Sequence, residues 1–584
     1  MTKAVDCAYF TRRMFIKSVL PAPLAGIGLA LAEMGDTILV GHAIGMDGLA
    51  AIGFTTPLFL VATFFVFGLS MGGAIVYSNF MHQGKKEEAL GVFNFFLRTA
   101  ALIGFGITVG GLVWQENLLI ALGISPEDGV VYELTKSYLF YILLGIPFEI
   151  LLEVFSAYLR NDDADTFSIV VQTAAGAGNI VISAALLFWF DWGIAGCSFG
   201  FFFSNFAATV ISVAYILFRS DGELSLCGKA ISFREAIKPL RLGFATATEY
   251  IFDAVFTLVV IHLLADMAGT DGVAIFNIIE NLSLLFIFMY EFIGKTSQPL
   301  FSTFFTECNF AELHRVFRYG LLYSLFLGVL ATIMVIVYPE ILDLLFGLED
   351  IEDVAKVYYA SRIFCLGTIF MGACLILQNY LQSEEDEGSA FLVVFMRRIG
   401  ASLPLAFILE PFGFYVFWLV YPLSEVVTLL VLGLYRWRKG EMKKIDRKRI
   451  YNATFANSLE EVSAHLDAME QFALYWGADR HKCNTLRLAV EEVCGIAQEQ
   501  AVNKPAESIL TQLSLIAQEN GKFQLYLRNN GADMDSLQLN DDCPIVNMEN
   551  QEKLGLIVLR AAKTRARQFL YRNYHGFNTI MVTV

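Results

Sequence analysis

The sequence predicts an α-helical polytopic membrane protein with a C-terminal α+β two-layer sandwich domain, and three observations support this fold class. The 584 residues are 56% hydrophobic and have a mean hydropathy of +0.57, which would leave too much apolar surface on a soluble protein of this length. Between Phe15 and Trp437 lie about twelve apolar segments, each long enough to cross a bilayer as a helix of roughly 20 residues. After Trp437 the composition becomes that of a soluble domain.

The expected membrane-spanning helices follow one another closely and form two six-helix bundles. Their predicted ranges are 15–40, 50–79, 91–114, 131–158, 166–190, 193–218, 240–268, 273–302, 316–338, 356–381, 388–410 and 413–437. The first bundle is expected within residues 1–220 and the second within residues 221–440. An internal echo supports this duplication, because Tyr158-Leu-Arg-Asn-Asp-Asp returns as Tyr380-Leu-Gln-Ser-Glu-Glu about 220 residues later.

Loop charges predict the orientation of the chain. Basic residues such as Lys85, Lys229 and Arg315 fall in alternate loops, and acids such as Asp128 fall in the others. Since Lys and Arg are retained on the cytosolic side, both termini are expected in the cytosol, beneath a bacterial inner (plasma) membrane. The basic run 436–449 would then contact anionic lipid.

Charge and cysteine content exclude some classes of protein. The net charge of −16 does not suggest a nucleic-acid partner. The nine cysteines contain no CxxC pair, so neither a zinc site nor a disulfide framework is expected. No bound metal or cofactor is predicted beyond a transported or coupling ion.

Acidic side chains inside the expected spans are the candidate functional residues, since an ionisable group in lipid is costly unless it faces water, a partner or a cavity. Asp36 and Glu33 lie in the first span, and Asp253 and Glu249 lie in its repeat mate, the seventh. A carboxylate in a low dielectric can hold a proton near neutral pH or bind Na⁺, so it can couple a cation gradient to a second ligand. The alternative is that these acids only organise helix packing. Further cavity candidates are Glu153 and Glu280.

The first expected span also contains Pro21 and Pro23. Proline removes a backbone hydrogen bond and permits a bend. A bend on the inner side of Asp36 would be able to move with the ionisation of that residue, and a static kink is the alternative.

At these residues the chain resembles the multidrug and toxic-compound extrusion (MATE) family, over residues 15–437. The matching residues are Pro23, the run Glu33-Met-Gly-Asp-Thr-Ile-Leu-Val-Gly41, Leu49-Ala-Ala-Ile-Gly53, Asn179-Ile-Val-Ile and Trp192-Gly-Ile-Ala-Gly196. The resemblance implies a transporter, not an enzyme, which exports amphipathic organic cations in exchange for H⁺ or Na⁺. It also implies that Asp36 holds the coupling ion, that Asn179 lies beside it, and that Asp253 assists from the second half. Ser183 stands where the family often has an aspartate, which favours H⁺ over Na⁺.

A flippase of the same superfamily, which moves lipid-linked sugars, is an alternative. Its pyrophosphate-bearing substrate would require a basic cavity. The expected spans are rich in acids and poor in bases, which argues against this alternative.

The tail, residues 451–584, is expected to be a cytosolic domain. Its apolar periodicity predicts helices at 459–476, 482–500 and 553–564 and strands at 509–517, 522–527, 567–571 and 579–584. This order resembles the histidine-kinase-like ATPase fold, and in particular the anti-sigma-factor kinases. The resemblance implies a nucleotide site. Glu492, in the helical run Leu488-Ala-Val-Glu-Glu492-Val, would be the catalytic base. Asn529 and Gly531 match the family's first glycine-containing nucleotide motif, and Gly555 matches the second.

Three departures indicate that this nucleotide site is degenerate. Ile496 replaces the asparagine that helps to hold Mg²⁺, Asn529 replaces the aspartate that reads adenine, and Lys553 replaces a glycine that lets the backbone approach phosphate. Nucleotide binding by the tail is therefore doubtful, and we interpret it as a regulatory module whose partner would be a cytosolic regulatory protein. In the alternative hypothesis, the membrane block is a sensor that signals through the tail.

Overall fold

Helices make up most of the described chain as far as Lys439, because a segment in lipid must satisfy its backbone N–H and C=O groups internally. The computed structural model describes residues 8–82, 85–162, 164–219, 224–226, 228–348, 351–439, 447–499, 508–531, 566, 568–574 and 577–584. Within these ranges, eleven helices are long and apolar enough to cross a membrane. The predicted fold class is confirmed: the chain is a multi-pass helical membrane protein that carries a small sheet domain at its C-terminal end.

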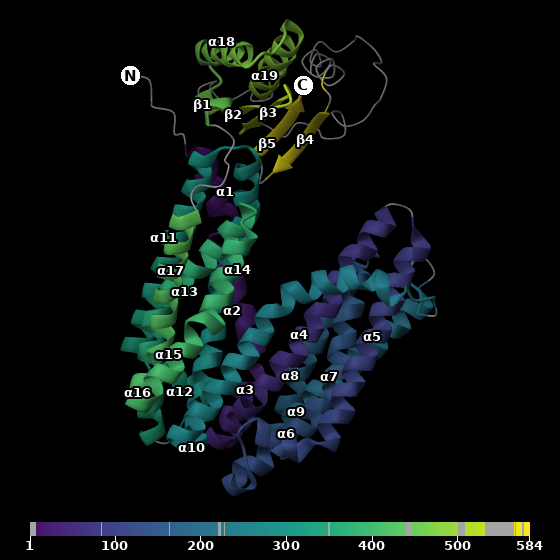
Figure 1. The fold of residues 1–584 in the computed structure, drawn as a ribbon, viewed down its shortest axis with the longest axis vertical. Coiled ribbons are helices and arrows are strands. Elements are labelled where there is room, and N and C mark those ends of the chain that lie inside the picture. Colours follow the sequence, from purple (N-terminus) through teal and green to yellow (C-terminus); the bar gives the residue numbers. More distant parts are fainter. Residues whose placement is uncertain are drawn as a thin grey trace.

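The membrane block consists of two bundles, drawn in purple to blue and in teal to green in Figure 1. The first bundle contains α4 (Met46–His82), α5 (Lys86–Val113), α6 (Gln115–Ala121), the 3₁₀ turn η1 (Pro126–Asp128), α7 (Val130–Arg160), α8 (Asp165–Phe188) and α9 (Ile194–Phe218). The second contains α10 (Phe233–Thr306), α11 (Phe310–Val337), α12 (Glu340–Phe346), α13 (Ile351–Ser383), α14 (Glu387–Phe395), the π-helix η2 (Met396–Gly400), α15 (Ser402–Leu409), the 3₁₀ turn η3 (Glu410–Phe412), α16 (Phe414–Phe417) and α17 (Val420–Lys439).

Helix α10 contains two crossings. Its apolar part has 60 residues, about three times the length that one crossing needs. Gly269 interrupts it with φ 64°, a backbone conformation that glycine adopts freely. The chain reverses at this point, because a methyl group at Gly272 would lie 2.7 Å from the Leu264 carbonyl oxygen, whereas residues eight apart in one continuous helix are about 12 Å apart along its axis. The predicted seventh and eighth spans are thus both present, and the crossings reach the expected twelve.

The predicted first span, 15–40, is not one helix, and this prediction is corrected. The segment forms α1 (Tyr9–Ser18), α2 (Ala22–Glu33) and α3 (Gly35–Ile44). The break between α1 and α2 coincides with Pro21, which has no N–H to donate and caps α2. The hydroxyl of Tyr323 donates a 2.8 Å hydrogen bond to the Leu20 carbonyl, so a carbonyl near the break has a partner.

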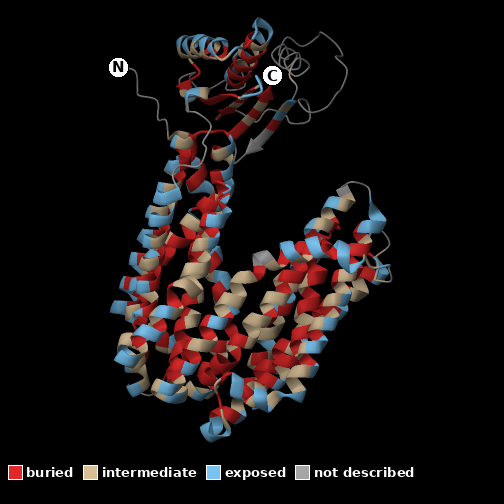
Figure 2. Cartoon of the chain, in the orientation of Figure 1, coloured by how far each residue is buried: buried red, intermediate tan, exposed pale blue. Residues whose placement is uncertain are grey.

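These three short helices divide their contacts between the bundles. Helix α1 contacts α11 and α2 contacts α10 of the second bundle, whereas α3 contacts α4, α8 and α9 of the first bundle and also α12 of the second. Residues 9–33 therefore lie on the second bundle, although they fall in the expected range of the first, 1–220. Figure 2 shows buried residues running through the interior of each bundle and exposed ones on the outer faces. Large apolar side chains are among the exposed residues, for example Leu102 and Phe218, as expected for surfaces that lipid covers.

The described part of the tail is a five-stranded antiparallel sheet with two helices packed on it. Its elements are the 3₁₀ turn η4 (Arg447–Arg449), β1 (Ile450–Ala456), α18 (Leu459–Tyr475), α19 (Arg480–Glu499), β2 (Leu510–Ala517), β3 (Phe523–Asn529), β4 (Gln568–Tyr574) and β5 (Phe577–Thr583). The strand order is β1-β2-β3-β5-β4, with Leu513 opposite Leu527 and Leu525 opposite Val582. Strand β1 was not predicted, and the predicted helix 553–564 lies outside the described residues.

The sheet lies beside α1 and the connection between α10 and α11 (Figure 1). Arg528 of β3 forms an ion pair with Glu307, which follows α10, at 2.5 Å between Nη2 and Oε1, and both side chains are at most 5% exposed. Phe577 of β5 packs edge-on against Phe10 of α1, with ring centroids 5.2 Å apart. The tail therefore contacts the membrane block through buried groups.

Candidate functional site

Asp36 and Asn179 meet inside the first bundle. Asp36 lies in the first turn of α3, where the unsatisfied N–H groups of a helix favour a negative charge. The Asn179 Nδ2 of α8 donates a 2.9 Å hydrogen bond to Asp36 Oδ2. Ser183, one turn further along α8, shares its single hydroxyl proton between two acceptors, Asn179 Oδ1 at 3.2 Å and the Cys197 carbonyl of α9 at 3.1 Å. Three helices thus hold the Asp36 carboxylate in place.

The second oxygen of this carboxylate has no partner. Asp36 Oδ1 is buried and makes no hydrogen bond, and within the described ranges no basic side chain pairs with Asp36. A buried carboxylate oxygen without a partner is costly. The group is therefore ready to take up a proton or a small cation, and it is the strongest candidate for a coupling-ion site. No cluster of three or more His, Cys, Asp or Glu side chains suited to a metal occurs in the part of the chain that the structure describes.

Asp253, the expected counterpart in the second bundle, is in a different environment. Arg398 Nε lies 2.6 Å from Asp253 Oδ1, an ion pair whose angles do not make a hydrogen bond. Arg398 belongs to the π-helix η2, and its neighbour Arg397 pairs with Glu425 of α17 at 2.8 Å. A π-helix is rare and often marks a functional site. Here it directs two arginines of one apolar span towards two acids, so Asp253 carries a compensated charge.

The other predicted acids are scattered. Glu280 accepts a 2.8 Å hydrogen bond from the Tyr421 hydroxyl. Glu153 accepts a hydrogen bond from Gln172 and lies 3.4 Å from Arg160. Glu33 is exposed at the end of α2, one residue before α3 begins. Glu249 lies one turn before Asp253 on α10 and is half-buried.

Pro21 and Pro23 lie where α2 begins, so the chain does break on the N-terminal side of Asp36, one helix before α3. A second break, at Met34, comes directly before the helix that carries Asp36. The two breaks make α2 a separate segment between the tail and the candidate site. Whether it moves with the ionisation of Asp36 stays a prediction.

The residues of the expected nucleotide site are only partly described. Asn529 at the end of β3 accepts hydrogen bonds from the Asn578 side chain at 2.9 Å and from the Gly531 N–H at 3.1 Å. Its amide oxygen is therefore engaged within the domain. Glu492 lies on α19 and is half-buried, and Gly555 lies outside the described residues.

Sequence reasoning missed several partners. The sequence did not predict several of the contacts described here: the Cys197 carbonyl beside Ser183, the two arginine–acid pairs of the second bundle, and the Arg528–Glu307 pair. An Arg-Arg pair within an apolar span was an available signal, because such residues need partners in lipid. Which acids would meet them depends on packing between distant segments.

Comparisons with known proteins agree with this architecture. A family model described as MatE matches residues 21–185 and 242–408, which is more than half of the chain. The "Probable multidrug resistance protein YoeA" of Bacillus subtilis (strain 168) is 20% identical over 445 residues, which cover 73% of this chain and 94% of that protein.

Two solved structures share the fold. An inward-facing multidrug resistance MATE family transporter of the MOP superfamily superimposes with a TM-score of 0.65 and 18% identity, covering 70% of this chain and 94% of its own. The MATE multidrug transporter DinF-BH, solved in complex with a small molecule, gives a TM-score of 0.57 and 20% identity, covering 74% of this chain and 96% of its own.

Proposed function

Since the chain belongs to the MatE family, it is a transporter rather than an enzyme, and we propose that it exports amphipathic organic cations in exchange for H⁺ or Na⁺. The relatives carry names such as multidrug resistance protein, and one solved neighbour is in complex with a small molecule. We propose small organic molecules of this kind as the substrates of this chain. The positive-inside pattern favours a cytosolic location for both termini, beneath a bacterial inner membrane.

The observation that carries the proposal is the unpartnered Oδ1 of Asp36. A carboxylate that takes up an inorganic cation loses its charge, and it regains that charge when the cation leaves. A ligand whose affinity depends on that charge is then coupled to the ion, because each ligand shifts the equilibrium between the same two states.

The neighbours of Asp36 favour H⁺ as the coupling ion. Na⁺ needs several oxygen ligands, and the nearby side chains offer few. The Asn179 Oδ1 already accepts from Ser183, and the Ser183 hydroxyl is shared with the Cys197 carbonyl. A proton needs only the free carboxylate oxygen.

The second bundle supports a cationic substrate over a lipid-linked pyrophosphate. Arg397 and Arg398 are the basic residues of an apolar span, and each is paired with an acid at 2.8 Å or less. Neither presents an uncompensated positive charge to an anionic substrate. The half-buried and exposed acids, Glu249 and Glu33, have no such basic partner within the described residues.

We further propose that the tail regulates transport, because the buried Arg528–Glu307 pair ties it to the end of α10. The rival hypothesis is a sensor that signals through the tail. Deleting residues 451–584 separates the two: ion-driven efflux that persists supports the transporter, and a membrane block without transport, accompanied by a lost cellular response, supports the sensor.

The decisive experiment is transport by the purified full chain in proteoliposomes. Efflux of a fluorescent organic cation such as rhodamine 6G is measured under separately imposed proton and sodium gradients. Asp36→Asn should abolish gradient-driven efflux, whereas Glu116→Gln, an exposed acid outside the site, should leave it intact. Gradient-driven efflux by Asp36→Asn at the wild-type rate would overturn the assignment.

A further inference from the structure

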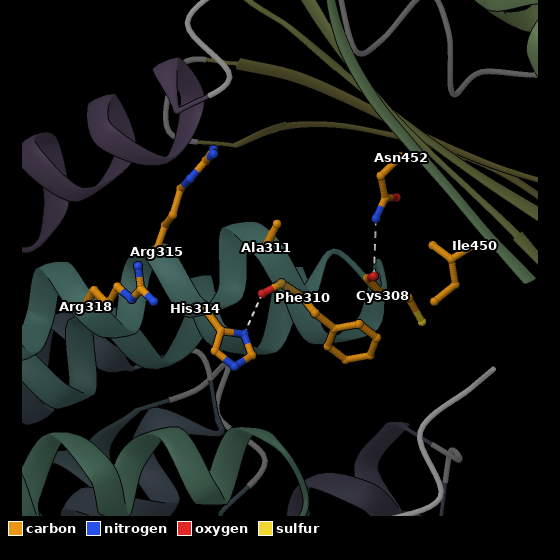
Figure 3. Close-up of a pocket in the computed structure, with 8 residues that line it drawn as sticks. All are labelled: Cys308, Phe310, Ala311, His314, Arg315, Arg318, Ile450 and Asn452. Atoms are coloured by element: carbon orange, nitrogen blue, oxygen red, sulfur yellow. Dashed lines mark hydrogen bonds between the residues drawn. The ribbon is translucent and has the colours of Figure 1, made fainter. Parts of the chain in front are cut away.

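A cavity of about 520 Å³ lies where the membrane block meets the tail, between the start of α11 and strand β1. Figure 3 shows that its lining comes from both parts of the chain. The residues that line it are Cys308, Phe310, Ala311, His314, Arg315, Arg318, Ile450 and Asn452.

The lining is basic. Three of its eight residues, His314, Arg315 and Arg318, can carry a positive charge, and none is acidic. Arg315 is held by Glu312 at 2.5 Å between Nη1 and Oε1, and the same acid also accepts a hydrogen bond from Thr11 of α1. Arg318 is exposed and has no acidic partner within the described ranges, so its guanidinium group is free to bind an anion.

Neighbouring residues strengthen the positive potential. Helix α1 lies beside this end of α11, as the 5.7 Å contact between the rings of Phe15 and Tyr319 shows. Three further cations of α1, Arg12, Arg13 and Lys17, are exposed. This concentration of positive charge is local, because the chain as a whole carries −16.

Residues of the first turns of the candidate membrane-crossing helix Phe310–Val337 line the cavity, at the end of the membrane block that carries the tail. Lipid headgroups are expected at the end of a helix that crosses the hydrocarbon core. Basic residues at such a boundary attract anionic lipid, by about 1 kcal/mol for each cation near the surface. Guanidinium groups recognise phosphate oxygens through directed, charge-assisted hydrogen bonds.

The geometry points to a binding site for a phosphate-bearing anion in this cavity. Its guanidinium ligands are Arg318 and Arg315 of α11, and the amide of Asn452 lies on the opposite wall in β1 (Figure 3). Because Asn452 already donates to the Cys308 carbonyl across the junction, at 3.4 Å, an anion bound here touches both sides of the contact between the tail and the membrane block. The phosphate is either the headgroup of an anionic phospholipid or a soluble phosphate compound.

Native mass spectrometry of the full-length protein in detergent tests this site. Phosphatidylglycerol, phosphatidylcholine and inorganic phosphate are the three probes. Arg318→Gln should weaken phosphatidylglycerol binding about fivefold, and Arg318→Lys should retain most of it. Arg241→Gln is the matched control, because Arg241 is also an exposed arginine at the start of a membrane-block helix and lies outside the cavity.

The probes distinguish the two sources of phosphate. If Arg318→Gln weakens phosphatidylglycerol but not phosphatidylcholine, the site takes a lipid headgroup. If the same variant weakens inorganic phosphate alone, the site takes a soluble phosphate. The proposal is wrong if Arg318→Gln changes the binding of neither phosphatidylglycerol nor inorganic phosphate. It is also wrong if Arg241→Gln produces an equal loss.

Discussion

Asp36 and Asp253 occupy corresponding spans of the two halves, but their carboxylates have different partners. Asp36 receives one amide hydrogen bond and keeps a free oxygen, whereas Asp253 is paired with Arg398 at 2.6 Å. A paired carboxylate has little to gain from a proton or Na⁺. We therefore expect the coupling ion to bind in the first bundle. The paired Asp253 and Arg398 of the second bundle would not bind it.

Ser183 offers a test of the choice of coupling ion. Ser183→Asp would place a second carboxylate beside Asp36, and two nearby negative charges should attract Na⁺ about tenfold or more tightly. The expected result is sodium-driven efflux at lower Na⁺ concentrations than in the wild type, measured in proteoliposomes. Ser183→Asn, of the same shape without the charge, is the control, and an equal response of both variants would contradict the argument.

His465 makes the stability of the tail depend on pH. Its ring stacks on Phe455 with centroids 4.6 Å apart, and burial lowers the pKa of its imidazole below the usual 6.5, although Glu461 opposes this. The unfolded chain then binds the proton more readily than the folded one. The stabilisation that this shift gives to the folded tail is complete at pH values above the pKa of His465 in the unfolded chain. It is lost as the pH falls through the pKa of His465 in the folded chain.

The measurement is hydrogen exchange of tail amides in the full chain at pH 7.5 and 5.5, corrected for intrinsic exchange rates. Protection should fall at the lower pH in the wild type and should change less in His465→Gln. A loss of protection of the same size in both proteins would assign the effect to other groups.

The sequence anticipated part of the candidate site. Asp36 and Asn179 were named together because the resemblance places them in one site, and the structure does join them. The Asp253–Arg398 pair was not foreseen, because residues 145 positions apart meet only through the packing of α10 on η2. The apolar periodicity of a single helix does not indicate which residue of another helix will lie beside it.

At the scale of elements, the close packing of α2 on α10 explains why this helix has small residues. A methyl group at Gly26 would lie 2.5 Å from the Phe288 carbonyl oxygen, whereas one at Gly28 would meet nothing within 4 Å. Helices in membranes associate through such small residues, which let backbones approach each other.

The pair Gly26 and Gly28 is therefore a matched test on a single helix. Gly26→Ala should lower stability by about 1–3 kcal/mol, because the added methyl group forces the helices apart. Gly28→Ala should have no destabilising effect, since alanine favours the helix. Thermal unfolding of the two variants in detergent checks this, and equal melting temperatures would show that α2 does not pack here as described.

The elements themselves were largely predictable, since a bilayer imposes a minimum apolar length on every crossing. The predicted tail helix 459–476 matches α18, for example, and the predicted strand 509–517 matches β2. The break before α2 falls at the prolines that predicted a bend, whereas the break at Met34 was harder to predict, because Glu33 and Met34 are both good helix formers. Strand β1 was missed because its ladder partner β2 lies more than 50 residues further along the chain.

At the scale of the whole molecule, the tail and the N-terminal helices form one continuous contact with the second bundle. Strand β5 packs on α1, α1 packs on α11, and α2 leads from there to the helix that carries Asp36. A physical connection thus runs from the tail to the candidate ion site. It gives the proposed regulation a route, provided that docking of the tail depends on contacts that can be broken.

The Arg528–Glu307 pair is the contact to break. Arg528 is 2% exposed and Glu307 is 5% exposed, and removing one partner of such a pair leaves the other charge buried and alone, at a cost of about 3–5 kcal/mol. Arg528→Met should therefore release the tail, and the double variant Arg528→Met/Glu307→Gln should restore much of the docking. Arg487→Met is the control, because Arg487 forms only surface ion pairs, worth under about 1 kcal/mol.

Docking is read from the distance between spin labels on β5 and on the start of α11, measured in the full chain by pulsed electron resonance. The single variant should broaden and lengthen that distance, and the control should not. Efflux by the same proteins then shows whether release of the tail raises or lowers transport. An unchanged distance in Arg528→Met would mean that the apolar contact of Phe577 with Phe10 holds the tail by itself, and the ion pair would then have no part in regulation.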